Sequence, residues 1–539
     1  MACEKPGSEG RRGGVLGIVA TCLNLLALGS GFAHVLLPDS AGLGFLFGCL
    51  LPAAVAATCA GCSGRASHRR LSLLYLAWTA AGFALLPFLM IAWATFLGVD
   101  GFSAATQVVV FGTLVLGLFL GTKNDGRARE KSRQRPGAAV AGFAAGIAAL
   151  AVTVRFLTSP HPRMAGVLIP QCLPYWSLAF LSTAALSARA YGTLRRSRAG
   201  SLLFALPALA AAALAAIPVY QTPGVIRAAE RDFLRAFGDV ASFAASSRGR
   251  DKPFSPGLLF LGSDTGKAVP RLDVPYHSET VPDGRSYTFR FDQWSPDGGG
   301  RHPVLIRIHG GGWVSGDKGY GNMNNVNRHF ASLGYVVFDL QYGLAETGNF
   351  RTRAPTPEGM LGPFVIEDML RHIGAFSSYL AENARELGAD LDRVFVSGAS
   401  AGGHLALASV LTLSSGYVRT HPGVGLDPRI TVRGVIPFYP GVGYAAEMGV
   451  PSSPDLDDLV PLLGPGNPPA LFYQGSLDGM VDPRRVREFV RAYGKSGGQP
   501  AVLVEFPSAG HGSDFVFWNP YSQVFLHYME RFLAIHSLR

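Results

Sequence analysis

The C-terminal half of this 539-residue chain contains no cysteine, because all six cysteines lie before residue 173. That half therefore needs no disulfide and would tolerate an oxidising compartment without mispairing. Cys59 and Cys62 have the spacing of a redox motif, but they end an apolar run instead of following a strand. We interpret this pair as small packing residues. The other cysteines are Cys3, Cys22, Cys49 and Cys172.

The chain also lacks the motifs of several function classes. Its 13 histidines are scattered, with no His-x-x-Glu-His or paired-cysteine pattern, so no metal site is predicted. No Walker loop or dinucleotide fingerprint is present, so no cofactor is expected. The net charge of +10 does not indicate nucleic-acid binding, because the first 220 residues hold 18 Lys and Arg against 6 Asp and Glu. The remainder is slightly acidic, and no nucleic-acid partner is predicted.

Hydrophobic residues make up 48% of the chain, and most of the excess lies in the first 220 residues. Apolar runs there reach the roughly 20 residues that cross a hydrocarbon core about 30 Å thick. They lack a polar face and are rich in alanine, glycine and leucine, as in closely packed membrane helices. Seven spans are predicted, with six or eight as alternatives. They are 15–37, 42–62, 72–97, 103–121, 137–157, 164–187 and 201–219.

Positive charge alternates between the loops that connect these spans. Sixteen of the eighteen basic residues before position 220 lie in four segments, namely 1–14, 63–71, 123–135 and 189–198. The positive-inside rule makes these segments cytoplasmic. With seven spans, we expect a multi-pass membrane protein whose amino terminus is cytoplasmic and whose chain after residue 220 is extracytoplasmic.

A different pattern begins after residue 220. Residues 221–267 predict a juxtamembrane helix over 225–245, followed by a linker punctuated by glycine and proline. From residue 268 to 539, two strands expected to be antiparallel precede strands that alternate with helical patterns. This alternation predicts an α/β domain with a mostly parallel sheet covered on both faces. The membrane region is predicted to be an all-α bundle over residues 1–220.

One strand of the α/β domain leads into a Gly-x-Ser-x-Gly turn made by Gly398, Ser400 and Gly402, with a helix expected from Ala401. A serine is a poor nucleophile unless a base takes its proton and the backbone presents its oxygen to the substrate. A sharp turn between strand and helix provides that presentation, because it exposes Oγ above the sheet. Ser400 is therefore the candidate nucleophile.

About ninety residues upstream, another strand runs into His309, Gly310, Gly311 and Gly312. Backbone N–H groups approach a developing alkoxide only where no side chain blocks them, which favours glycine. Gly311 and Gly312 are predicted to donate from this loop, and Ala401 from the turn after Ser400, as an oxyanion hole.

Downstream, Asp478 follows the apolar strand 470–474, and His511 lies between two glycines after the strand 501–506. Serine, aspartate and histidine in this order, each at the carboxyl end of a strand, is the triad order of the α/β-hydrolase fold. Asp482 is the alternative to Asp478, although an aspartate before Pro483 suits a helix N-cap.

Residues 270–539 resemble bacterial carboxylesterases of the hormone-sensitive-lipase-like and feruloyl/acetyl-esterase-like branches of the α/β hydrolases. The resemblance rests on the His-Gly-Gly-Gly-Trp and Gly-x-Ser-x-Gly-Gly-His runs and on the turns with Asp478 and His511. It implies Ser400 as nucleophile, His511 as general base and then acid, and Asp478 as the group that orients His511.

Secondary roles are predicted for several neighbouring side chains. His309 and His404 are expected to brace the loops of the site. Three aromatic residues are candidates for an acyl pocket, with plain core packing as the alternative. They are Trp313, Tyr342 and Tyr439.

The expected function is that of a membrane-anchored serine carboxylesterase that forms an acyl-enzyme and acts on envelope lipids, acylated glycans or external esters. One alternative is acyl transfer to an envelope lipid or glycan hydroxyl. Another is a transporter or sensor whose outer domain only binds, although the spans contain few of the charges that mark a substrate path. The polar residues of the spans are interpreted as packing or interfacial. They are Asn24, His34, Gln107 and Gln171.

Overall fold

The structure is a computed structural model, and the residues it describes cover most of both regions. They are 8–36, 41–63, 69–96, 101–122, 136–162, 164–195, 197–238, 252–262, 266–320, 323–347, 354 and 356–538. The predicted basic segment 123–135 and parts of the other three basic segments lie outside the described residues, as does Cys3. Residues 239–251, which hold the end of the predicted juxtamembrane helix and the first part of the predicted linker, also lie outside them.

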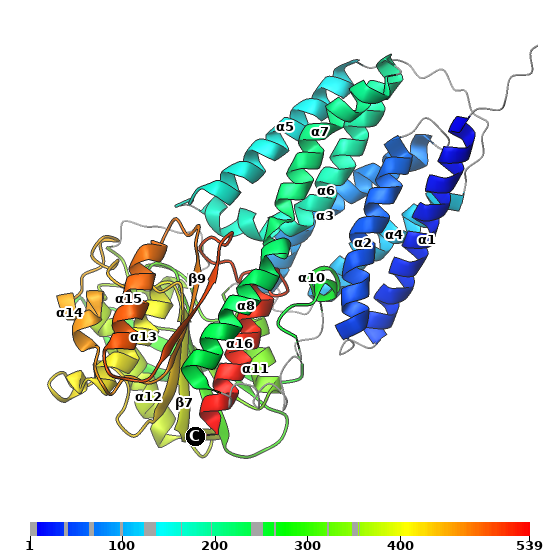
Figure 1. Ribbon diagram of the computed structural model, residues 1–539. Helices are drawn as coiled ribbons and strands as arrows, with labels where there is room; N and C mark the ends of the chain where they lie inside the picture. The colour runs from blue at the N-terminus through cyan, green and yellow to red at the C-terminus, as the bar shows by residue number, and fades with distance from the viewer. Residues whose placement is uncertain are drawn as a thin grey trace, which may run out of the picture.

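The N-terminal region is a bundle of long helices (Figure 1). They are α1 (Ser8–Leu36), α2 (Ala41–Ser63), α3 (Arg69–Phe96), α4 (Gly101–Thr122), α5 (Pro136–Thr158), α6 (Met164–Arg195) and α7 (Arg198–Ala215). Among the described residues, six helical segments are long and apolar enough to cross a membrane. The predicted span 103–121 falls on α4, whose apolar stretch Thr106–Leu120 is shorter. Large apolar side chains, such as those of Phe45 and Leu203, are exposed on the outside of the bundle, as lipid-facing side chains would be.

Helix α8 (Ile217–Phe237) continues from α7 with a break at Ala216, where Pro218 near the start of α8 lacks an N–H group. The boundary expected near residue 220 therefore falls inside this helix. The C-terminal part of α8, where the sequence predicts a juxtamembrane helix, is not separate from the α/β domain. Phe233 and Phe237 pack against Tyr528 and Phe532 in the core of the α/β domain.

Short helix α10 (Pro256–Leu261) lies in the segment expected to be a linker, but it is buried against the bundle. The ring of Phe260 meets the rings of Phe83 and Tyr175 edge-on, at centroid distances of 6.4 and 6.2 Å. Both α8 and α10 thus join the two regions by packing.

The C-terminal region is built on an eight-stranded sheet with the order β1-β2-β4-β3-β7-β8-β9-β10. Its strands are β1 (Val269–Thr280), β2 (Ser286–Ser295), β3 (His302–Ile308), β4 (Val336–Leu340), β7 (Ala389–Ala399), β8 (Val432–Phe438), β9 (Ala470–Gly475) and β10 (Ala501–Phe506). β2 pairs antiparallel with β1 and β4, and all the other pairings are parallel. A small second sheet pairs β5 (Leu344–Ala345) with β6 (Leu361–Gly362). The predicted mostly parallel α/β sheet is confirmed.

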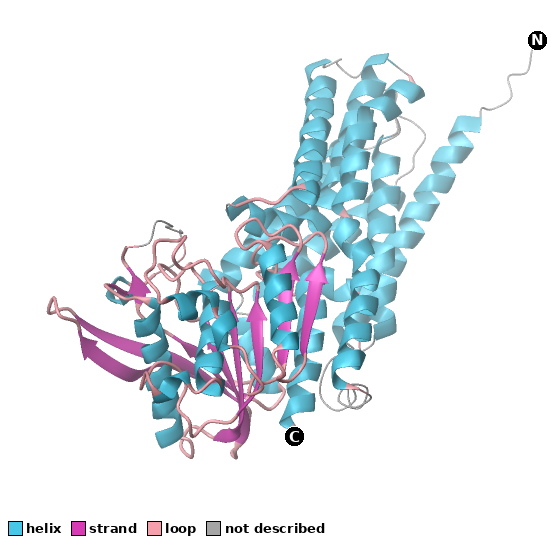
Figure 2. Cartoon of the chain, turned by 60° about the vertical axis from the view of Figure 1, so that its left-hand side comes forward, coloured by secondary structure: helices cyan, strands magenta, loops and turns pink. Residues whose placement is uncertain are grey.

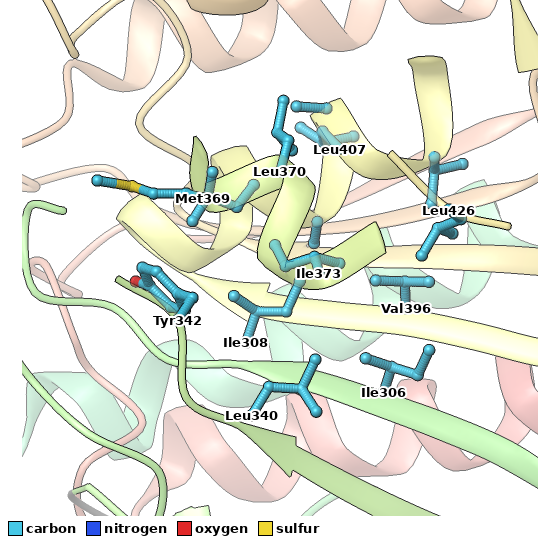
Figure 3. Packing of buried hydrophobic residues seen from close by; sticks show 14 of the residues in the cluster. Ile306, Ile308, Leu340, Tyr342, Met369, Leu370, Ile373, Val396, Leu407 and Leu426 are labelled. Atoms are coloured by element: carbon cyan, nitrogen blue, oxygen red, sulfur yellow. The ribbon is translucent and has the colours of Figure 1, made fainter. Parts of the chain in front are cut away.

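Alternate residues of each strand point to opposite faces of the large sheet. Apolar side chains lie on both faces, and helices cover both of them. On one face, Ile306, Ile308 and Val396 pack against Leu370 and Leu407 (Figure 3). That face carries α12 (Ile366–Glu382), α13 (Ala401–Ser414), α14 (Pro454–Asp458) and α15 (Pro483–Lys495). The opposite face carries α8, α11 (Met323–Ser332) and α16 (Pro520–Ser537). The arrowheads of the parallel strands point toward the helical bundle (Figure 2).

Candidate active site

Ser400 occupies the turn between β7 and α13 with a φ of 55° and a ψ of −118°, a conformation that non-glycine residues rarely adopt. Close packing explains the glycines on either side. A Cβ atom on Gly398 would lie 2.1 Å from the carbonyl oxygen of Gly402, and one on Gly402 would lie 2.2 Å from that of Ile308. The turn is therefore held tightly against the end of β3, with Ser400 at its apex.

His511 links Ser400 to Asp478. The Nε2 atom of His511 lies 3.0 Å from Ser400 Oγ, and its Nδ1 atom lies 2.8 Å from Asp478 Oδ2. A carboxylate only accepts hydrogen bonds, so Nδ1 carries the proton and Nε2 is left to accept from the serine hydroxyl. The three side chains come from turns after β7, β9 and β10, and these turns meet at one edge of the sheet.

The Asp478 carboxylate is fixed on all sides, and the residue is only 2% exposed. Its Oδ1 atom accepts hydrogen bonds from the amides of Met480 and Val481 at 2.8 and 2.9 Å. Its Oδ2 atom accepts a further bond from Gln474 Nε2 at 3.1 Å. With both oxygens held in this way, the carboxylate presents one orientation to His511.

Asp482, the alternative to Asp478, lies at the start of α15. Its side chain accepts a hydrogen bond from the amide of Arg484 at 2.9 Å, as an N-cap does. Hydrogen bonds from Arg484 lower the pKa of the Asp482 carboxyl below its usual value. Among the described residues, Asp482 forms no hydrogen bond with His511.

The loop after β3 lies directly against the serine turn. A Cβ atom on Gly310 would lie 2.7 Å from the carbonyl oxygen of Ala399. Gly311 and Gly312 have φ values of 127° and 63°. Within the described part of the chain, no group accepts a hydrogen bond from the amides of Gly311, Gly312 or Ala401. Ala401 also begins α13, where the helix leaves its first N–H groups free.

The side chains of His309 and Tyr342 stabilise this loop by ring stacking and hydrogen bonds. Their rings stack at a centroid distance of 4.4 Å, and the Tyr342 hydroxyl donates to the carbonyl oxygen of His309 at 2.8 Å. His309 Nδ1 donates in turn to the carbonyl oxygen of Gly310, at 2.8 Å. Burial lowers the pKa of His309 below its ordinary value, so the ring stays neutral. Tyr342, a candidate pocket residue, is only 1% exposed and braces the glycine loop.

His404 and Trp313 pack together behind the serine turn, with their rings edge-on at 5.4 Å. His404 Nε2 donates to the carbonyl oxygen of Leu456 at 2.7 Å. Trp313, the second candidate pocket residue, is 2% exposed and has a φ of 62°. Both side chains therefore contribute to the framework around Ser400.

Tyr439, the third candidate pocket residue, has its ring centroid 4.5 Å from that of His511. Its hydroxyl donates to Asp514 Oδ1 at 2.5 Å. Burial raises the pKa of the Asp514 carboxyl above its usual value. Asp514 and Gln474, the partner of Asp478, are not among the residues predicted from the sequence. A glutamine inside the apolar strand 470–474 was a usable signal, and so was an aspartate three residues after His511.

The C-terminal region is similar to proteins described as esterases. A family model described as BD-FAE matches residues 292–443. The probable carboxylic ester hydrolase LipM of Mycobacterium tuberculosis (strain ATCC 25618 / H37Rv) is 25% identical in an alignment 238 residues long that covers 40% of this chain and 51% of LipM. Esterase LipQ of the same strain is 27% identical in an alignment 289 residues long that covers 48% of this chain and 62% of LipQ. The chain thus spans about half of LipM and less than two thirds of LipQ.

A plant protein and a solved structure show weaker likeness. A probable isoprenylcysteine alpha-carbonyl methylesterase of Oryza sativa subsp. japonica is 31% identical over 123 residues, which are 23% of this chain and 25% of that protein. The apo form of Thermogutta terrifontis esterase 2 is 22% identical with a TM-score of 0.37, over 49% of this chain and 91% of that chain. Residues 292–443 carry a BD-FAE domain, and the C-terminal region of this chain is a hormone-sensitive-lipase-like α/β hydrolase, homologous to the esterases LipM and LipQ.

Proposed function

We propose that the protein is a membrane-anchored serine carboxylesterase that uses Ser400, His511 and Asp478. The observation that supports this most directly is the hydrogen-bonded chain from Ser400 Oγ through His511 to Asp478. Ester cleavage also requires stabilisation of a developing oxyanion. The amides of Gly311, Gly312 and Ala401, which have no acceptor within the described part of the chain, can donate hydrogen bonds to it.

In the first half of the reaction, Ser400 Oγ attacks the ester carbonyl carbon and passes its proton to His511 Nε2. The carbonyl oxygen becomes an oxyanion that accepts hydrogen bonds from the amides of Gly311, Gly312 and Ala401. Asp478 stabilises the imidazolium that forms. When the carbon–oxygen bond breaks, Nε2 returns the proton to the departing alcohol, and an acyl group remains on Ser400.

In the second half, a water molecule takes the place of the alcohol. His511 Nε2 accepts its proton as the hydroxide attacks the acyl carbon, and the same amides bind the oxyanion. Collapse of this intermediate releases the carboxylic acid and returns the proton to Ser400. Each group is then restored for another cycle.

The test is the Ser400→Ala substitution in the full-length protein, in detergent, with a p-nitrophenyl ester as substrate. We expect kcat to fall by several orders of magnitude. Ser397→Ala is the matched control, because Ser397 is buried on β7, the strand that leads to Ser400, and its Oγ has no hydrogen-bond partner among the described residues. Equal turnover by the Ser400→Ala variant and the parent would refute the assignment.

The full chain is the right material for this test. Helix α8 supplies Val225, Phe233 and Phe237 to the hydrophobic core of the α/β domain. A fragment that begins after this helix would expose the apolar surface that it covers, at a cost of roughly 25 cal/mol per Å².

We also propose that the hydrolase lies on the extracytoplasmic side of the membrane. Helix α6 begins at Met164 beside the hydrolase and ends at Arg195, at the other end of the bundle (Figure 1). Arg195 belongs to a segment rich in positive charge, which favours the cytoplasm. Reporter fusions after Arg129 and after Arg250 test this orientation. An export-dependent reporter should be active only at the second position, and the opposite result would place the site in the cytoplasm.

The position of the site favours substrates found at a membrane surface, namely envelope lipids or acylated glycans. The carboxyl ends of the parallel strands, which carry the site, point toward the bundle (Figure 2). An ester carried in lipid vesicles should therefore compete with a soluble p-nitrophenyl ester for the full-length enzyme. Absence of competition would leave small external esters as the substrate class.

A further inference from the structure

The connection between α5 and α6 touches the turn that carries Asp478. The backbone of His161 forms a parallel β-bridge with Asp478, and its ring stacks on Phe156 of α5 at a centroid distance of 4.0 Å. Gly479, the residue after Asp478, lies directly against this connection. A Cβ atom on Gly479 would be 2.3 Å from the carbonyl carbon of His161 and 2.5 Å from its nitrogen. The membrane region therefore forms one wall of the Asp478 turn.

Helix α6 makes a second contact, with the loop that carries His511. Gln171 is fully buried, and its Nε2 atom donates to the carbonyl oxygen of Gly512 at 2.9 Å. Its Oε1 atom accepts from the amide of Val516 at 2.8 Å and from Asn519 Nδ2 at 3.2 Å. A single amide side chain from the bundle thus binds three positions of the loop after β10.

The glycines beside His511 show how closely α6 approaches this loop. A Cβ atom on Gly510 would lie 2.3 Å from the carbonyl oxygen of Gly166. That oxygen belongs to the first turn of α6, where Pro170 has no N–H to bond it within the helix. Further along the loop, Val516 is 1% exposed and lies in the hydrophobic core of the bundle. The loop therefore contacts the membrane region at several points between Gly510 and Val516.

We infer that Gln171 is a positioning residue of the active site, and that the membrane bundle completes the catalytic machinery of the hydrolase. The inference rests on the proposed esterase function. Gln171 fixes Gly512 and Val516, and thereby sets the distance from His511 Nε2 to Ser400 Oγ. A shift of His511 by about 1 Å would impair proton transfer without changing the surfaces that bind the ester.

The variant that tests this role is Gln171→Leu in the full-length protein, assayed in detergent with p-nitrophenyl acetate. We expect kcat to fall about 10- to 100-fold while KM stays within about twofold of the parent. Labelling of Ser400 by a fluorophosphonate, measured per folded molecule, should slow by the same factor. That labelling rate reports the activation of the nucleophile, which a loss of folded protein alone does not change.

Asn24→Leu is the matched control. Asn24 is also a fully buried amide of the bundle, but its Nδ2 atom donates to the carbonyl oxygen of Ala20 on its own helix α1 and to Thr58 Oγ1 on α2, so its partners lie within the bundle. We expect the control to lower thermal stability as Gln171→Leu does, with kcat close to that of the parent. If Gln171→Leu retains the kcat of the parent, or if both variants lose kcat equally, the positioning role is wrong.

A second variant, Gln171→Glu, keeps the inference testable if Gln171→Leu fails to fold. The carboxyl group that it introduces keeps an acceptor for Val516 and Asn519 but donates to Gly512 only when it is protonated. The ratio of its kcat to that of the parent should therefore rise as the pH is lowered, and a ratio independent of pH would overturn the inference. Failure of the esterase proposal is distinguishable, because Ser400→Ala would then keep its activity.

Discussion

Arg307 on β3 and Asp339 on β4 are register partners in the middle of the sheet, and both side chains are buried. Asp339 Oδ2 accepts hydrogen bonds from the amide of Gly319 and from Asn327 Nδ2, at 2.8 and 2.9 Å. Its Oδ1 atom has no hydrogen-bond partner among the described residues. Burial raises the pKa of the Asp339 carboxyl to about 7 from an ordinary value of 3.8. The sheet thus contains a carboxyl group that keeps its proton in mildly acidic solution.

This raised pKa predicts how stability changes with pH. Between about pH 4 and about pH 7 the folded state holds a proton on Asp339 that the unfolded state has lost, so the free energy of unfolding falls as the pH rises. Asp339→Asn keeps an acceptor and removes the titration. Its Tm, measured at about pH 5 and about pH 8, should fall less between the two than the Tm of the parent.

Asp427→Asn is the control for that experiment. Arg429 holds the pKa of the Asp427 carboxyl at about 2, so this group titrates below the pH range of the test. Its substitution should change the Tm by the same amount at both values. Parallel pH profiles for the parent and the Asp339→Asn variant would contradict the prediction.

Exchange of Gly479 for alanine should disturb the turn that carries Asp478, because Gly479 lies against the connection between α5 and α6. The added Cβ would meet the backbone of His161, which is not free to rotate away as a side chain is. We expect a fall in kcat of about 10-fold or more in the p-nitrophenyl ester assay. Gly494→Ala in α15 is the control, because nothing lies within 4 Å of its added Cβ. Similar activity in both variants would mean that the contact with His161 does not affect the turn.

Substitutions of Asp478 and Asp482 should have different effects on kcat and on stability. Asp478→Asn leaves an uncharged group beside His511 and favours the wrong tautomer, so kcat should fall about 10³- to 10⁴-fold. Asp482→Ala removes the N-cap of α15 and should cost about 1 kcal/mol of stability while kcat is retained. Steady-state kinetics and thermal unfolding of both variants check this. The reverse outcome would make Asp482 the triad acid.

The sheet could be predicted from the sequence because its signals are local. Apolar strands of five to seven residues, each followed by a turn motif, place Ser400, Asp478 and His511 at the same edge once the strands are parallel. The two aspartates could not be distinguished by pattern alone. Their difference depends on Gln474 and on the amides of Met480 and Val481, which surround only Asp478.

Contacts between the helical bundle and the α/β domain could not be predicted from local sequence signals. Gln171 is an isolated polar residue in an apolar span, and the sequence alone indicates a packing or interfacial residue. Its hydrogen-bond partner Gly512 lies 341 positions later in the chain. The glycine before His511 is a second example. The need for glycine at position 510 follows from the approach of α6, which the sequence does not reveal.

Only the break at Ala216 separates α8 from α7 of the bundle. The C-terminal part of α8 lies in the hydrophobic core of the hydrolase. A domain attached in this way cannot swing as one on a flexible tether does. With the bundle in a membrane, as we propose, Ser400 would stay at a constant height above the bilayer and would reach only molecules that diffuse in the plane of the membrane or arrive at that height. For the lipid esters proposed as substrates, encounter would be a two-dimensional search whose rate should depend on the surface density of the ester more than on its bulk concentration.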